Sequence, residues 1–105
     1  MRIAVPSMGG EKKSAVSSTL GRCRFIMIYN SVTGKYSAIP NPGISLMDGS
    51  GIKAVETIVQ SHADIVLTKE VGVKAYSALA KERVAVILIN TETSVDEVIK
   101  KYLKK

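Results

Sequence analysis

The sequence predicts a single α/β domain over residues 1–105, in which helices pack on a mixed sheet in the order β-β-β-α-β-α-β-α. Three observations predict it. The first forty residues carry the apolar and branched segments of an initial strand and a hairpin. Two almost continuous apolar runs, 63–67 and 84–89, are typical of strands buried on both faces. Three segments with apolar residues at helical spacing alternate with these runs, as in β-α-β units.

The first part of the chain is expected to supply three strands. Residues 3–5 form a short strand that Pro6 ends, because proline cannot donate to a hydrogen-bond ladder. The connection from 7 to 20 is long for a small domain, and long connections are often functional or mobile. The segments 23–29 and 36–40 then form a hairpin.

The second part alternates helices with the two apolar strands. A helix over residues 50–61 turns its apolar side chains to one side. A second helix spans 73–81, with two alanines and a leucine on its inner face. A third helix runs from a capping box at residues 94–97 to about Leu103, with acids in its first turn and lysines in its last.

The net charge of +6 is concentrated at the end of the chain. Four of the last six residues are lysines, which leaves +2 for the remaining 99 residues. A lysine-rich last helical turn is favoured by the helix dipole and by solvation, and aromatic residues for base stacking are few. We therefore favour a solvated helix end and expect no nucleic-acid partner; the alternative is a phosphate-binding stripe formed by this lysine tail.

Other compositional features define the class of protein. No apolar run reaches the roughly 18 residues that a membrane span needs, and the first residues read as a strand, not a signal peptide. The single cysteine, Cys23, excludes an internal disulfide and fits a reducing compartment. We expect a cytoplasmic protein, with no membrane partner.

Several catalytic classes find no support in the pattern. Nothing in the spacing brings Cys23 and His62 together, and no nucleophile elbow is present. A two-metal nuclease with this element order needs an aspartate on the first strand, but residues 3–5 are Ile-Ala-Val. No general base is placed beside a nucleophile, so we expect no enzyme.

The best candidate for a binding site lies where the second half of the chain begins. Asp48, Gly49, Ser50 and Gly51 lead into a helix that Asp48 or Ser50 caps, and its free N–H groups suit an anion. Gly72 stands at the start of the next helix, on the same side of a parallel sheet. The alternative is that these glycines serve only as tight turns between strand and helix.

Five segments together resemble one known family. They are residues 1–6 (MRIAVP), 21–23 (GRC), 41–42 (NP), 49–52 (GSGI) and 71–75 (VGVKA). Their order and spacing resemble the dinitrogenase iron–molybdenum cofactor biosynthesis family, of the NifX type, with its small stand-alone members. The resemblance covers nearly the whole chain. It implies a ribonuclease H-like fold without the nuclease acids.

The resemblance also implies a function and a site. The better-known members of the family bind or carry the iron–molybdenum cofactor or its iron–sulfur precursor, so the resemblance implies metallocofactor-assembly proteins as partners. Arg22 would offer positive charge to an anionic cluster, and Cys23 a thiolate ligand to its metal. The remaining expected cofactor-binding residues are Gly21, Met47, Asp48, Gly49, Ser50, Gly51 and Gly72.

Two positions depart from the family pattern. Members commonly read Ser-Pro-His-Phe-Gly-Arg over residues 17–22, where this chain has Thr19 in place of the histidine. They also commonly carry a histidine where this chain has Met47. The missing histidines favour an alternative function, a protein-interaction or regulatory module of the same fold that has lost cofactor binding. The last helix and the loop over 7–20 are its candidate surfaces.

Overall fold

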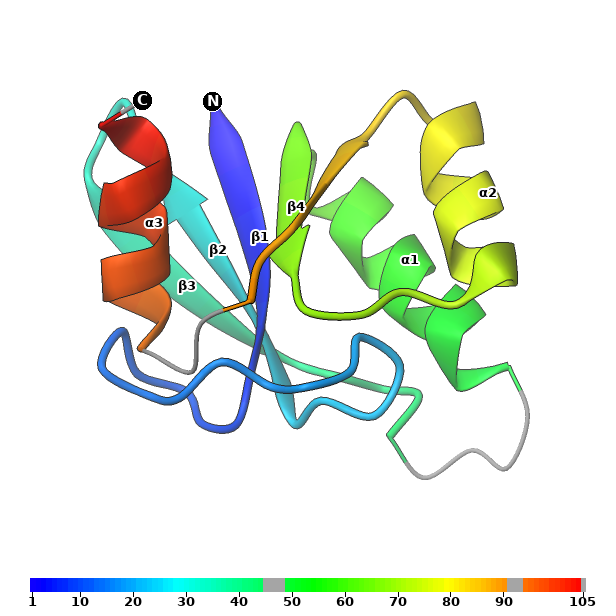
Figure 1. Ribbon diagram of the computed structural model, residues 1–105. Coiled ribbons are helices and arrows are strands. Elements are labelled where there is room, and N and C mark those ends of the chain that lie inside the picture. The colour runs from blue at the N-terminus through cyan, green and yellow to red at the C-terminus, as the bar shows by residue number, and fades with distance from the viewer. Residues whose placement is uncertain (45–48, 91–93, 105) are drawn as a thin grey trace.

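Residues 1–44, 49–90 and 94–104 are the part of the chain that the computed structural model describes, and over this part the chain forms five strands and three helices (Figure 1). In chain order they are β1 (Arg2–Ser7), β2 (Phe25–Asn30), β3 (Lys35–Pro40), α1 (Ser50–Gln60), β4 (Ile65–Thr68), α2 (Val73–Lys81), β5 (Ala85–Leu88) and α3 (Val95–Leu103). None of the described helices has the length and apolar character needed to cross a membrane.

The strands form one mixed sheet in the spatial order β3-β2-β1-β4-β5. The first three strands pair antiparallel, with β1 in the middle of the sheet, and the hairpin of β2 and β3 closes at the pair Asn30 and Lys35. Gly34, with φ of 74°, supplies the left-handed residue of that hairpin turn. β4 pairs parallel with β1, and β5 with β4. The predicted α/β class with a mixed sheet is therefore confirmed.

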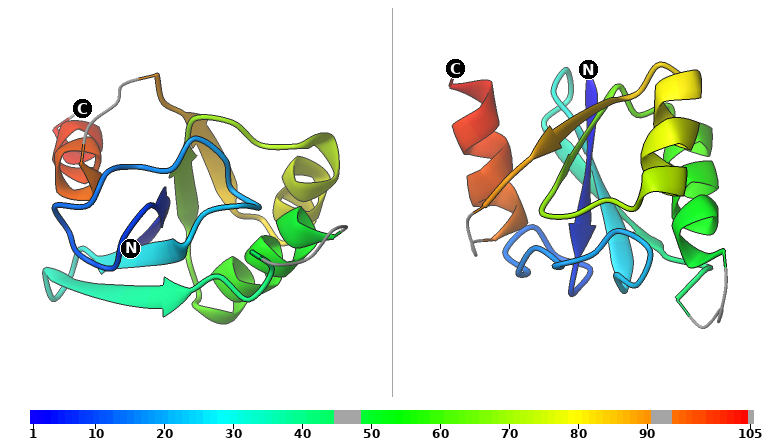
Figure 2. Two further views of the ribbon diagram at one scale, coloured as in Figure 1. Left: turned by 90° about the horizontal axis from the view of Figure 1, so that it is seen from below. Right: turned by 45° about the vertical axis from the view of Figure 1, so that its right-hand side comes forward.

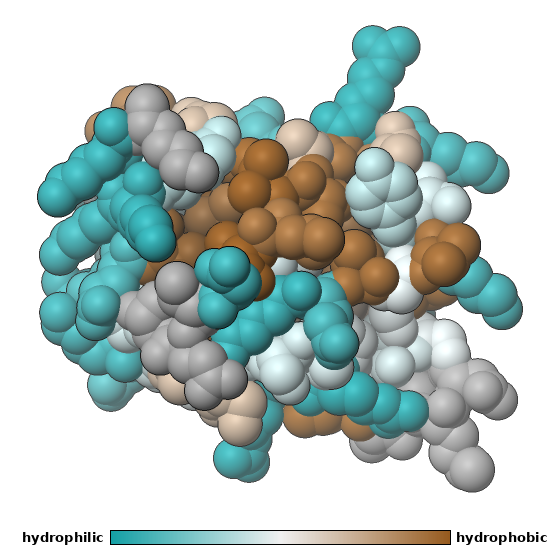
Figure 3. Space-filling model, in the orientation of Figure 1, coloured by the Kyte–Doolittle hydropathy of each residue, from teal (hydrophilic) through white to brown (hydrophobic). Residues whose placement is uncertain are grey.

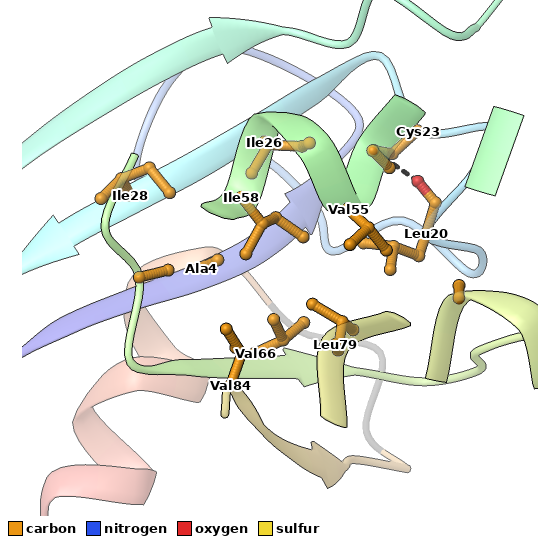
Figure 4. Close-up of a cluster of buried hydrophobic side chains, with 13 residues drawn as sticks. Ala4, Leu20, Cys23, Ile26, Ile28, Val55, Ile58, Val66, Leu79 and Val84 are labelled. Atoms are coloured by element: carbon orange, nitrogen blue, oxygen red, sulfur yellow. Dashed lines mark hydrogen bonds between the residues drawn. The ribbon is translucent and has the colours of Figure 1, made fainter. Parts of the chain in front are cut away.

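Helices cover both faces of this sheet. Figures 1 and 2 show α1 and α2 together on one face and α3 alone on the other. A buried cluster lies under each layer, and Figure 4 shows the one under α1 and α2. That cluster includes Ala4, Ile26, Ile58, Val66 and Leu79, and the cluster under α3 includes Ile3, Val5, Leu67, Val95 and Ile99. Alternate residues of β1 and β4 thus face opposite layers, as a strand buried on both sides requires.

The prediction that Pro6 ends the first strand was wrong. β1 continues to Ser7, and Pro6 lies opposite Ile26 of β2. The carbonyl of Pro6 accepts the N–H of Ser17 at 2.8 Å, on the side away from β2. The proline nitrogen faces that same side, because the N–H and C=O of one strand residue point together. The ladder with β2 therefore loses no donor to the proline.

The prediction that the last strand is buried was also wrong. β5 is an edge strand with mostly exposed side chains, and Leu88 is 64% exposed. Only Val84, just before the strand, is fully within the core. The reason is that α3 packs mainly on β1, so the α3 layer does not reach far enough to cover β5.

The loop over residues 7–20 is tied to the start of α3. The N–H of Val95 donates to the carbonyl of Ser14, and the N–H of Asp96 to that of Lys12, both at 2.9 Å. The Lys13 ammonium lies 2.9 Å from the buried carboxylate of Asp96. Ser94 begins the helix as predicted, but no side chain caps its backbone, because the loop carbonyls take that role.

Candidate functional site

An open pocket of about 460 Å³ lies where the chain enters β2 and where α1 and α2 begin. Six of the nine site residues predicted from the sequence line it, namely Gly21, Arg22, Gly49, Ser50, Gly51 and Gly72. Its other lining residues are Thr19, Leu20, Ile52, Glu70, Val71, Lys74 and Ala75, which the sequence analysis did not assign to the site. This volume lies within the range of small-molecule sites. Met47 and Asp48 lie outside the described residues.

The first turn of α1 forms one wall of the pocket. Gly49 is its N-cap, in the left-handed conformation with φ of 78°, which glycine adopts without strain. Among the described residues no side chain caps the helix. The prediction that Ser50 caps it was wrong, because Ser50 is already the first helical residue, and the alternative cap, Asp48, lies outside the described residues. The first intrahelical bond runs from Lys53 N–H to the Gly49 carbonyl, at 3.0 Å. The N–H groups before it have no intrahelical acceptor.

The first turn of α2 forms the facing wall. Its N-cap is Gly72, in extended conformation, and again no side chain caps the helix. The bond from Tyr76 N–H to the Gly72 carbonyl, at 2.9 Å, is the first within it. Neither α1 nor α2 carries an acidic residue in its first turn, so neither helix supplies an anion to its own positive end.

The charged side chains around the pocket are mostly positive, as are the N-terminal ends of the two helices. Arg22 and Lys74 are exposed lining residues, and Glu70 is the one carboxylate among the described lining residues. Two positive helix termini and two cationic side chains thus face one hollow. Such an arrangement favours an anion, since backbone N–H groups and cations both act as donors to it.

Close backbone packing brings these walls together. A Cβ added at Gly21 would lie 2.9 Å from both the Gly51 nitrogen and the Ser50 hydroxyl oxygen. Only a residue without a side chain lets the loop before β2 lie directly on the first turn of α1. Gly51 in turn faces α2, where a Cβ on it would meet the Cβ of Ala75 at 3.5 Å.

Asn41 holds the loop that carries Gly21 and Arg22, and the sequence analysis missed this role. Its side chain is nearly buried, and its amide nitrogen donates to the carbonyls of Gly21, at 3.1 Å, and Cys23, at 2.9 Å. Its amide oxygen accepts the N–H of Gly43 at 3.1 Å. An asparagine before Pro-Gly signals a turn, but the sequence does not show which distant carbonyls it reaches.

Cys23 does not line the pocket. Its side chain has no exposed surface and lies in the core cluster under α1 and α2, where Figure 4 shows its bond to the Leu20 carbonyl, at 3.1 Å. Burial raises the pKa of the thiol to about 11. The predicted thiolate ligand is therefore a protonated core side chain in this conformation. Within the described part of the chain, no three His, Cys, Asp or Glu residues gather as a metal site would require.

A comparison with family models shows the family of this chain. A family model described as "Dinitrogenase iron-molybdenum cofactor" matches residues 1–105. An uncharacterized protein of Methanocaldococcus jannaschii is 30% identical over 107 residues, which cover 99% of this chain and 86% of that protein.

Two solved structures have the same fold and moderate sequence identity. The apo form of the orange protein from Desulfovibrio gigas superposes with a TM-score of 0.93 at 27% identity, over 98% of this chain and 87% of the other. A Thermotoga protein of the DUF35 family, described as a candidate NifB protein, gives a TM-score of 0.86 at 27% identity, with the same coverage.

Proposed function

The chain belongs to the dinitrogenase iron–molybdenum cofactor family, and from this premise we propose that it binds or carries an anionic metallocofactor of the iron–sulfur or iron–molybdenum type. The observation that carries the proposal is the pocket between the starts of α1 and α2. Two helix ends that no described side chain caps meet there beside Arg22 and Lys74. In this role the cofactor is cargo, and the protein releases it to another.

The donors of the pocket suit the surface of such a cofactor more than its metal ions. Metal–sulfur cofactors are anionic, and N–H groups and cations bind anions. None of the described lining residues is a cysteine, histidine or methionine, the side chains that bind iron best. We infer that the pocket holds its cargo by hydrogen bonds and charge. A carrier gains from this, because no metal–ligand bond must break at transfer.

The proposal has further parts. The role is non-enzymatic, since the Cys23 thiol is buried and the described pocket lining contains neither a cysteine nor a histidine. Residues 1–105 act as one ribonuclease H-like domain in the cytoplasm, and metallocofactor-assembly proteins supply or receive the cargo.

The alternative proposal is an interaction or regulatory module that has lost the cofactor. Thr19 favours it, because this residue lines the pocket at the position where family members commonly carry a histidine. A threonine hydroxyl is a poor ligand for iron. Under this alternative the pocket binds no metal–sulfur species at all.

Anaerobic reconstitution separates the two proposals. The purified protein is treated with ferrous iron and sulfide, with and without molybdate, then desalted, and its visible absorption and metal content are measured. Bound metal with sulfur-to-metal charge-transfer bands supports carriage. A folded, colourless and metal-free protein contradicts it and favours the interaction module.

Matched variants locate the cargo. Lys74→Glu places a negative charge in the pocket, whereas Lys81→Glu makes the same change in the last turn of α2, outside the pocket lining. Carriage in this pocket predicts that only the first variant loses metal. Cys23→Ser tests the thiolate ligand: loss of metal from a folded variant would support it, and retention is what burial of the thiol leads us to expect.

A further inference from the structure

The free edge of β5 is an apolar surface that the chain itself leaves uncovered. Ile87 is 38% exposed and Leu88 64% exposed, and they lie on opposite faces of the strand. Figure 3 shows the resulting apolar surface over β5, between α3 and α2, with hydrophilic side chains gathered on the α3 side. This surface shares no lining residue with the pocket between the helix starts.

The strand also presents backbone groups to solvent. The N–H groups of Ala85 and Ile89 donate to carbonyls on the β4 side, at 3.1 and 2.9 Å. Because alternate residues of a strand point their N–H and C=O groups to opposite sides, those of Val86 and Leu88 face the free edge. An added strand would find its donors and acceptors there.

The two edges of the sheet differ in how they are protected. β3, at the other edge, contains Lys35 and Pro40, which discourage the addition of a further strand. β5 reads Ala-Val-Ile-Leu and carries neither a charge nor a proline. The absence of these devices on β5 indicates an edge suited to pairing.

A small hollow beside β5 can receive one side chain. It has a volume of about 120 Å³, and Ile87, Ile89, Val98 and Tyr102 are among its lining residues. A cavity of about 150 Å³ accommodates a benzene molecule, so this one suits a branched aliphatic side chain. Lys101 of α3 stands at its wall.

The charge around the hollow selects the partner. Lys101 and Lys104 lie toward the end of α3, while Asp96, at its start, is paired with Lys13 and, at 3.9 Å, with Lys100. A second copy of the chain would bring the same net charge of +6 and repel this one. A partner with acidic residues beside an apolar one is attracted instead.

We propose that β5 is the docking edge for an extended, acidic segment of a partner protein. The segment adds a strand along Val86 and Leu88, places an aliphatic side chain in the hollow, and sets carboxylates against Lys101 and the neighbouring lysines. The proposal does not depend on cofactor binding, because it uses a different surface.

A synthetic peptide of about ten residues tests the proposal directly. It carries a central leucine, glutamate two residues to either side, and threonine elsewhere; a second peptide has lysine in place of glutamate. Amide hydrogen exchange of the native protein is followed by NMR at low ionic strength. We expect the acidic peptide to slow exchange at Val86 and Leu88, and the basic peptide to have no such effect.

Charge-reversal variants provide the control. Lys101→Glu should weaken binding of the acidic peptide about tenfold, whereas Lys35→Glu, on the opposite edge strand, should leave it unchanged. Equal binding of both peptides, no slowing at Val86 and Leu88, or equal effects of the two variants would overturn the proposal. Sedimentation of the protein alone is the second readout, because a dimer that protects Val86 and Leu88 without peptide assigns the edge to a second copy and also overturns it.

Discussion

Substitution of Gly21 by alanine tests whether close packing of the loop on α1 builds the pocket. The added methyl group would lie 2.9 Å from the Gly51 nitrogen and the Ser50 hydroxyl oxygen, and 3.2 Å from the Gly51 Cα. Two of these three neighbours are backbone atoms, which cannot turn aside as a flexible side chain would. The loop and the first turn of α1 must therefore separate.

The magnitude follows from two opposing effects. Overpacking of a well-packed site costs about 1 to 3 kcal/mol. The backbone at Gly21 is not left-handed, so alanine can adopt it. Alanine also lowers the conformational entropy of the unfolded chain, which raises the free energy of unfolding by about 0.4 to 1 kcal/mol. The expected net loss in the free energy of unfolding is about 1 to 2 kcal/mol, a fall of roughly 4 to 10 °C in Tm for a chain of this size.

Gly72→Ala is the matched control. Nothing lies within 4 Å of a Cβ added there, and its extended backbone accepts alanine. Urea and thermal unfolding of the two variants and the native protein give the comparison, with an expected change within about 0.5 kcal/mol for Gly72→Ala. A Gly21→Ala protein as stable as the native one, or an equal loss in Gly72→Ala, would refute the reasoning.

Three further predictions concern buried polar groups. The Ser94 hydroxyl and the Lys13 ammonium hold the pKa of the Asp96 carboxyl at about 2. The contribution of this carboxylate to the free energy of unfolding is therefore fully present above pH 4 and is lost as the pH falls toward 2. Asp96→Asn should cost about 1 to 2 kcal/mol at pH 7 in urea unfolding, less toward pH 2. Asn41→Ala, which leaves buried carbonyls unpaired, should cost about 2 to 4 kcal/mol in the same assay. The Cys23 thiol, with a pKa of about 11 and no exposed surface, should resist iodoacetamide at pH 8 until urea unfolds the chain, as mass spectrometry would show.

Local patterns predicted the helices and the inner strands well. The second helix has the predicted bounds, Val73–Lys81, because its apolar period and its glycine start are both local signals. β4 is buried throughout, as its apolar run predicted. These features depend on few residues that are close together in sequence.

The predictions were wrong where contacts with residues distant in sequence determine whether a strand continues or is buried. Pro6 is tolerated inside β1 because its nitrogen faces away from β2, and the sequence gives no sign of which side that is. The apolar run 84–89 carries the same signal as β4, but only β4 has a strand on each side and a helix layer above and below. Burial of a strand is a property of its place in the sheet.

The site was located by a mixture of local and topological signals. Gly49 and Gly72 each stand at the start of a helix that follows a strand in the chain. Connections between parallel strands bring such helix starts to the same end of the sheet. Arg22 and Cys23 belong to the predicted site through the family resemblance, in which they stand together in one short segment. In the structure Arg22 lines the pocket while Cys23 enters the core, so adjacency in the chain was a poor guide to a shared site.

The separation of the two proposed surfaces has a physical consequence for a carrier. A chain of 105 residues, with only α3 on one face of its sheet, leaves both edge strands, β3 and β5, largely exposed, and β5 is the edge without a charge or a proline. A partner bound along that edge would leave the pocket at the helix starts accessible, since the two surfaces share no lining residue. A cargo that is held by hydrogen bonds and charge can be exchanged without breaking a metal–ligand bond. The contact of the cargo with the pocket and the contact of the partner with β5 both weaken as salt screens their charges. Raised ionic strength should therefore weaken the binding of cargo and of partner alike.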